Sequence, residues 1–149
     1  MPNIPIAINV DFTGVTYSNG AWAGTPGFNA APDSAPVHNG NNNITWTLAA
    51  VNVPTGYTAA FTSDGIVFKA TNQQSWNNAP TLQTDGTITA SDNFARLSAD
   101  EYFYYTTKVQ LTPRAGTNGA SNSWTFDPDV VNEGGNAPVK TQVKLIAAT

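Results

Sequence analysis

The sequence predicts an all-β fold, an antiparallel β-sandwich of about seven to nine short strands. Apolar and polar residues alternate in several segments, and this period of two is typical of a strand with one buried face. Clusters of Gly, Pro, Asn and Asp separate the segments. No helical period extends beyond one turn, and no repeat occurs at solenoid spacing. The length is that of one domain, which we expect to span residues 1–149.

A long hairpin near the C-terminal third has the strongest pattern. The aromatic and β-branched content of Glu101–Leu111 predicts a strand, and Ser123–Asn132 is its predicted partner. Residues 112–122 between them are rich in turn formers. The side chains predicted to face inward on the first strand are Phe103, Tyr105, Thr107, Val109 and Leu111.

The first predicted strand is Ile4–Phe12, in which Ile, Val or Phe occupies every second position. Pro5 has no N–H to donate to a neighbouring strand, which indicates a sheet edge or the beginning of a strand, so this strand is a candidate for a sheet edge. A long loop follows at about residues 18–43, because glycines and prolines dominate there. A loop of this length is usually packed or functional, and a short strand around Val15–Tyr17 also fits the sequence.

Two Asp-Gly dipeptides predict hairpins in the middle of the chain. After a strand at Ile44–Leu48, the first hairpin joins Tyr57–Phe61 to Ile66–Ala70 through Asp64-Gly65. The second turns at Asp85-Gly86.

Two further elements complete the prediction. Ser91 or Asp92 has the side chain of a helix N-cap, so we expect a single helical turn through Phe94 and Leu97. A last strand covers residues 139–145, with the Val and Leu side chains facing inward.

The charge content excludes several classes of function. Charged residues make up 11% of the chain, less than half the usual share of about 25%. The net charge is −4 and the six basic residues are dispersed, so we expect neither nucleic-acid binding nor attraction to an anionic membrane. The absence of Cys excludes disulfides and thiolate chemistry. The N-terminal residues lack the features of a signal peptide, which leaves the cytoplasm or export by a route that the sequence does not reveal.

Three motifs in order resemble those of small bacterial β-sandwich proteins of the DP-EP type and, more remotely, inclusion-body proteins of the PixA/AidA type. They are the Trp-x-Leu strand at Trp46–Leu48, the aromatic strand at Phe103–Thr107 and the Asp-Pro segment at Asp127–Asn132. The Asp-Pro segment has one extra residue before its Asn. The resemblance implies an immunoglobulin-like sandwich without known catalysis, and it transfers no site residues.

The densest acidic cluster contains Asp127, Asp129 and Glu133. Oxygen ligands of this kind bind Ca²⁺, but the spacing does not match an EF-hand loop. Hydrogen bonds from nearby backbone N–H groups explain the same residues without a metal. We therefore expect a turn here, with a calcium site as the alternative and no cofactor.

An amide-rich stretch around a single Trp is the second candidate site. An exposed indole and neighbouring amides are typical of sugar recognition, and Trp22 between two glycines offers a second platform. The candidate carbohydrate-binding residues are Gln74, Trp76, Asn77, Asn78 and Trp22. The alternative is that either Trp covers one end of the sandwich.

No enzyme activity is expected, because neither a nucleophile nor a general base stands out and the one His, His38, lies in a turn-rich segment. We expect a non-catalytic protein of structural or interaction type that forms a homo-oligomer or binds a protein partner. Low charge weakens repulsion between copies, and exposed strand edges allow pairing. The alternatives are a carbohydrate-binding module that recognises a glycan and a secreted or phage-type protein that decorates a surface.

Overall fold

The computed structural model describes residues 3–32, 34–37, 40–68, 78–94, 101–127 and 142–145. All regular structure in these residues is β-strand, which confirms the all-β prediction. The strands are β1 (Asn3–Asp11), β2 (Thr16–Ser18), β3 (Ala21–Ala23), β4 (Gly27–Ala31), β5 (Ser34–Val37), β6 (Gly40–Val51), β7 (Tyr57–Phe68), β8 (Asn78–Leu82), β9 (Ile88–Phe94), β10 (Glu101–Pro113), β11 (Asn122–Phe126) and β12 (Gln142–Leu145). The described part contains no helix with the length and apolarity to cross a membrane.

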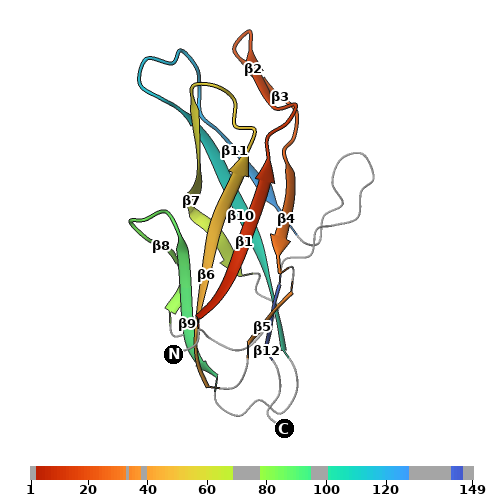
Figure 1. Cartoon of the computed structure of the whole chain (residues 1–149), viewed down its shortest axis with the longest axis vertical. Coiled ribbons are helices and arrows are strands. Elements are labelled where there is room, and N and C mark those ends of the chain that lie inside the picture. Colours follow the sequence, from red (N-terminus) through yellow and green to blue (C-terminus); the bar gives the residue numbers. More distant parts are fainter. Residues whose placement is uncertain are drawn as a thin grey trace.

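Two five-stranded sheets form the body of the protein (Figure 1). The front sheet has the order β4-β1-β6-β9-β8. The back sheet has the order β11-β10-β12-β5, and β7 also pairs with β10. The short strands β2 and β3 form a separate hairpin that extends beyond one end of the front sheet (Figure 1). Most pairs are antiparallel, but β1 with β6 and β5 with β12 are parallel.

The apolar core lies where the two sheets face each other. Trp46 of β6 contacts two rings of the back sheet, with centroid distances of 5.5 Å to Tyr105 and 6.0 Å to Phe68. Phe12, just after β1, meets Trp124 of β11 at 5.7 Å. Burial of each large apolar side chain stabilises the fold by about 1.5–3 kcal/mol. The largest fully buried side chains are Trp46, Tyr105, Phe12, Ile6, Ile8, Ile44, Ile88, Leu111 and Val10.

The hairpin of β10 and β11 confirms the strongest sequence pattern. The two strands pair antiparallel from Thr107 opposite Phe126 to Leu111 opposite Asn122. The predicted inward residues from Tyr105 to Leu111 are buried, and those between them are half-buried. The predicted partner strand continued to Asn132, and its residues beyond 127 lie outside the described part.

The prediction that the first strand is an edge is wrong, since β1 lies between β4 and β6. Its pairing with β6 runs from Asn3 to Asp11, whereas its pairing with β4 begins only at Ala7. Pro5 therefore lies in the part of β1 for which β6 is the one described partner. A proline indicates that the strand lacks a partner only near the proline itself. Here the pairing of β1 with β4 begins two residues after Pro5.

The predicted loop at residues 18–43 is also wrong, because it contains β3, β4, β5 and the start of β6. These strands are short, and the turn residues between them dominate the composition. β4 belongs to the front sheet and β5 to the back sheet, so the chain crosses between the sheets at Ala31-Pro32, a cis peptide bond. Inward positions on β4 carry Phe28 and Ala30, too weak an alternation to identify the strand from sequence.

Of the two predicted hairpins, only the one at Asp85-Gly86 forms. It joins β8 to β9, with Leu82 opposite Ile88. Asp64-Gly65 instead lies within the continuous strand β7, where a bulge interrupts the pairing with β10.

The predicted helical turn at Ser91 and Asp92 does not form in the described residues, where β9 continues to Phe94. Ser91 and Asp92 pair with Asn43 and Asn42 of β6, so a neighbouring strand satisfies the backbone in place of a helix. Ser and Asp are good helix N-cap residues, but the pairing with β6 outweighs this local preference for a helix. The last predicted strand overlaps β12, and Leu97 lies outside the described residues.

Candidate functional site

The residues predicted for sugar binding are only partly described. Gln74, Trp76 and Asn77 lie outside the described residues, as does His38. Asn78 is the first residue of β8, at one edge of the front sheet, and its side chain is exposed. Its amide nitrogen donates a hydrogen bond to the Ser91 hydroxyl of β9 at 2.9 Å.

Trp22 contacts other parts of the same chain. Its indole N–H donates to the backbone carbonyl of Ala120 at 3.0 Å. Its ring meets three other aromatic rings, with centroid distances of 5.2 Å to Tyr17, 5.0 Å to Tyr57 and 5.7 Å to Trp124. These contacts attach the β2–β3 hairpin to β7 and β11, so Trp22 has the packing role that the sequence allowed as its alternative.

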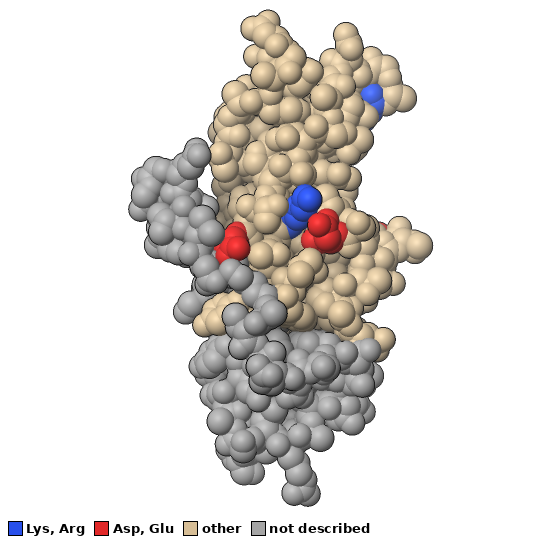
Figure 2. All heavy atoms as spheres, turned by 180° about the vertical axis from the view of Figure 1, so that it is seen from behind, with Lys and Arg blue, Asp and Glu red and all other residues tan. Residues whose placement is uncertain are grey.

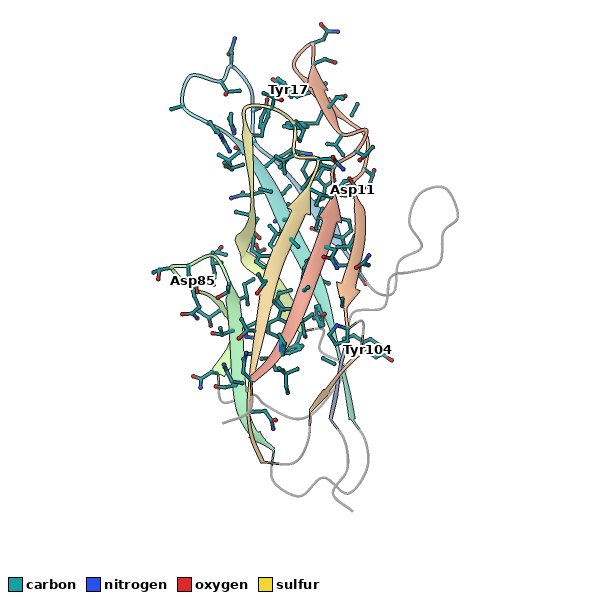
Figure 3. All side chains as sticks on the ribbon, in the orientation of Figure 1. Asp11, Tyr17, Asp85 and Tyr104 are labelled. Carbon is teal, nitrogen blue, oxygen red and sulfur yellow. The ribbon has the colours of Figure 1, made fainter. Side chains whose placement is uncertain are left out.

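Of the acidic cluster, Asp127 alone is described, and it is half-buried just after β11. Asp129 and Glu133 lie outside the described residues. Within the described part, no three His, Cys, Asp or Glu residues are grouped so that they could hold a metal ion. Figure 3 shows two of the carboxylates well separated, with Asp11 near the end of β1 and Asp85 at the tip of the β8–β9 hairpin.

The outward side of the front sheet carries mostly small and neutral polar side chains, and we call it the outer face. It consists of the positions that alternate with the buried ones on adjacent strands. Its central residues are Pro5, Ala7, Asn9 and Asp11 on β1, Gly27, Asn29 and Ala31 on β4, and Thr45, Thr47, Ala49 and Val51 on β6. Asp11, at the end of β1, is the one charged residue among them.

Strand register arranges these side chains in rows across the sheet. Ala7 lies between Ala31 and Thr47, and the next outward residue, Asn9, lies between Asn29 and Ala49. The composition of the outer face could be predicted in part from the sequence, because the outward positions of the predicted strands carry small or amide side chains. Which strands would be neighbours was not visible, since β4 was not predicted.

Hydrogen bonds between neutral side chains connect the strands along the outer face. The Asn9 amide nitrogen donates to the Asn29 side-chain oxygen at 2.8 Å, which links β1 to β4. Asn3 Oδ1 accepts from the Thr45 hydroxyl at 2.9 Å, which links β1 to β6. Just after β8, the Gln83 amide donates to the Thr89 hydroxyl of β9 at 2.9 Å. These bonds hold polar side chains in fixed positions without introducing charge.

Asp11 is bound by its neighbours. Its carboxylate accepts from the Asn52 amide at 2.9 Å and from the hydroxyl and backbone N–H of Thr13 at 2.7 and 3.0 Å. These hydrogen bonds, that of Asn52 first, lower the pKa of Asp11 below its ordinary value. The carboxylate therefore stays ionised at neutral pH and its oxygen lone pairs are partly occupied.

A shallow hollow of about 380 Å³ lies on this surface between β1, β4 and β6. Two of the residues that line it, Gly27 and Ala49, have small side chains or none. Asn9, Asn29 and the exposed Val51 also line it. The opposite side of the molecule also carries few charged groups among the described residues (Figure 2).

The fold and this surface define the chain, at the level of class, as an all-β protein with two packed sheets and a nearly uncharged outer face. No protein-family model matches the chain, and a search of the curated proteins found no match.

Proposed function

We propose that this chain is a non-catalytic protein with an immunoglobulin-like sandwich that acts by self-association, with a second copy bound to the outer face of the front sheet. The observation that carries the proposal is the composition of that face, whose central residues are small or neutral with one carboxylate at the margin. Two sheets packed over one apolar core support the immunoglobulin-like architecture. The resemblance of three sequence motifs to those of DP-EP proteins also supports an immunoglobulin-like sandwich.

A second copy fits this face because the face is complementary to itself. Each Asn or Gln side chain carries both donors and acceptors, so the same residues can bond to their symmetry mates across a two-fold axis. Small side chains such as Ala7, Ala49 and Gly27 allow two sheets to approach closely. The hydrogen bonds within the face already fix several rotamers, which reduces the entropy lost on association.

The first test is sedimentation velocity over a range of protein concentrations. A defined oligomer is expected, and its stability should change little with salt because few charges take part. The variant Ala49→Arg places a charge in the centre of the contact without removing a hydrogen bond, and we expect its dissociation constant to rise at least about tenfold.

Ala115→Arg is the matched control, because Ala115 is exposed in the turn after β10 and lies outside the outer face. It adds the same charge and should associate like the native chain. A native chain that sediments as a monomer at every concentration overturns the proposal. Equal weakening by both variants would attribute association to net charge rather than to this face, and would also overturn it.

The carbohydrate-binding alternative is supported by one position. Asn78 is exposed at the edge of the front sheet, so the amide-rich segment before it leads directly onto β8. A glycan array separates the two functions. If sugars bind, Trp76→Ala should abolish binding and leave the melting temperature nearly unchanged, whereas Trp22→Ala should lower the melting temperature because it removes three ring contacts.

A further inference from the structure

Two strands each have an edge without a strand partner in the described part of the chain. β9 pairs with β6 only from Gly40 to Trp46, whereas β1 continues along the other side of β6 to Val51. Among the described strands, the β9 side of Thr47–Val51 is therefore without a partner. Figure 1 shows the β8–β9 hairpin alongside the lower part of β6 only. On β7, residues Tyr57–Phe61 pair with β10, and no second described strand pairs with them.

A groove of about 470 Å³ lies between these two open edges. Its floor is apolar and consists of residues of β6, of β7 and of the loop between them that belong to the core or pack against it. The floor residues are Leu48, Ala50, Val53, Tyr57, Ala59 and Phe61. The groove has the volume of a typical ligand site, but it is an elongated opening between sheets with backbone edges on both sides.

Opposite charges lie at the two ends of the groove. Asp85, in the β8–β9 turn, lies at the end where β9 stops pairing with β6. Arg114 lies at the other end, where its backbone N–H donates to the carbonyl of Gly56 at 2.8 Å just before β7. The Thr87 hydroxyl and backbone N–H lower the pKa of Asp85, so this carboxylate is ionised at neutral pH.

The open edge and the apolar floor together match the requirements of strand addition. In a strand, every second residue directs its N–H and C=O toward one edge, so Thr47–Val51 offers backbone groups that an added strand can pair with. Side chains at alternate positions of that strand would then point into the groove. A five-residue strand is about 17 Å long, the length of the open stretch of β6.

We propose that the groove binds an extended segment of a partner polypeptide, which adds to β6 antiparallel and continues the line of β9. Its side chains are apolar at alternate positions, with an acidic residue at its start beside Arg114 and a basic residue at its end beside Asp85. The antiparallel direction is that of β9, which pairs antiparallel with β6 on the same side, and β6 runs from the Asp85 end at Thr47 to the Arg114 end at Val51. The proposal is independent of self-association, because none of the floor residues of the groove belongs to the outer face and Thr47 alone lines both.

The test uses two synthetic peptides of the same composition, EVTVTVK and KVTVTVE, both with blocked ends, in isothermal titration calorimetry with the native chain. The first peptide places its charges opposite those of the groove and is expected to bind at least about tenfold more tightly than the second. In the double variant Asp85→Asn/Arg114→Glu the preference should invert. Asn at position 85 keeps a side-chain oxygen that can accept from Thr87, so the turn should still form and the melting temperature should fall only slightly.

Two further measurements locate the binding mode. Backbone amides of Thr47–Val51 that face the open edge should exchange hydrogen more slowly when EVTVTVK is present. The peptide EVTPTVK, in which a central Pro removes an N–H and disfavours the extended ladder, should bind at least about tenfold more weakly. Equal binding of all three peptides would indicate a site for small apolar groups, and unchanged exchange in Thr47–Val51 would place the peptide elsewhere; either result overturns the proposal. Peptide binding by a chain that sediments as a monomer would support this inference while refuting self-association.

Discussion

The dipeptide Asp-Gly occurs twice in this chain, at residues 64–65 and 85–86, and the two copies adopt different structures. At 85–86 the chain reverses between β8 and β9. Gly86 has φ +90°, and a side chain added there would meet nothing within 4 Å. The Gly86 N–H donates to Gln83 at 3.1 Å and the Gln83 N–H to Thr87 at 2.8 Å, so the turn closes through its own backbone.

At 64–65 the chain continues in the same direction. Phe61 pairs with Val109 and Ile66 with Thr107, so four residues of β7, 62–65, lie opposite Lys108 alone. Gly65 is buried, and a Cβ added there would lie 2.8 Å from the Ile88 Cδ1 of the front sheet and 2.9 Å from Phe61 Cβ. This glycine is required because another sheet approaches it closely, and not because of a positive φ.

The comparison shows that the same dipeptide serves two physical needs. Both aspartates accept a hydrogen bond from a nearby Thr hydroxyl, Asp64 from Thr62 at 2.6 Å and Asp85 from Thr87 at 2.7 Å. What differs is the partner strand. β10 is long enough to pair with β7 on both sides of the bulge, so β7 has no reason to end at Asp64.

The largest effect is expected from Gly65→Ala. The added methyl group would lie within 3.0 Å of two side-chain atoms and a backbone oxygen, so the sheets must shift apart locally. Overpacking of this kind costs about 2–3 kcal/mol of unfolding free energy, which urea denaturation measures. A loss below about 0.5 kcal/mol would show that the close approach of the sheets at Gly65 does not matter.

Gly86→Ala should cost less, about 1 kcal/mol, because the space around it is open and only the positive φ is unfavourable. Gly86→Asn is the matched control, since Asn tolerates this conformation, and it should recover part of the loss. A larger loss of unfolding free energy for Gly86→Ala than for Gly65→Ala in the same urea experiment would contradict this assignment, in which packing at Gly65 matters more than backbone conformation at Gly86.

The two Asp-Gly dipeptides should contribute alike to the loss of unfolding free energy in acid, although their backbone conformations differ. A Thr hydroxyl is the first cause that lowers the pKa of Asp64 and of Asp85. A lowered pKa adds stability above the unfolded value near 3.9, and this stability is lost as the pH falls through the folded pKa. The unfolding free energy should therefore fall below about pH 4, and Asp64→Asn and Asp85→Asn should each make it less dependent on pH in that range. A native chain equally stable at pH 2 and pH 6 contradicts this.

The smallest effect is expected from Lys108→Met. The Lys108 ammonium lies 3.7 Å from Asp64 across the bulge, but both side chains are partly exposed, at 35% and 59%. Water and salt screen such a pair, so its removal should change the unfolding free energy by less than about 0.5 kcal/mol. A larger loss that disappears in high salt would show that the ion pair holds the bulge in place.

Much of the fold could be predicted because alternation is a local property. Ile6, Ile8 and Val10 face the core as their spacing predicts, and the same holds for Tyr105 to Leu111. The outward residues of the outer face follow from the same alternation, since they are the positions between. The prediction was wrong where a distant strand decided the outcome, as at Pro5 and at Ser91.

The candidate groove was not predictable, because it depends on where pairing stops. Nothing within Thr47–Val51 indicates that β9 ends its pairing at Trp46, and nothing near Tyr57 indicates that β10 is the one described strand that pairs with Tyr57–Phe61. Its end charges, Asp85 and Arg114, are 29 positions apart in the sequence, and register alone brings them to one groove.

By itself, the sequence determined that this protein is built from strands, which side chains point inward and how little charge its surface carries, because each of these depends on residue type and on neighbours two positions away. The tertiary structure decided which strands are adjacent, which of two identical dipeptides turns the chain and where a strand edge stays open. Those outcomes depend on contacts between residues far apart in the chain, such as Ile88 with Gly65, and local preferences of less than about 1 kcal/mol yield to the burial of the core.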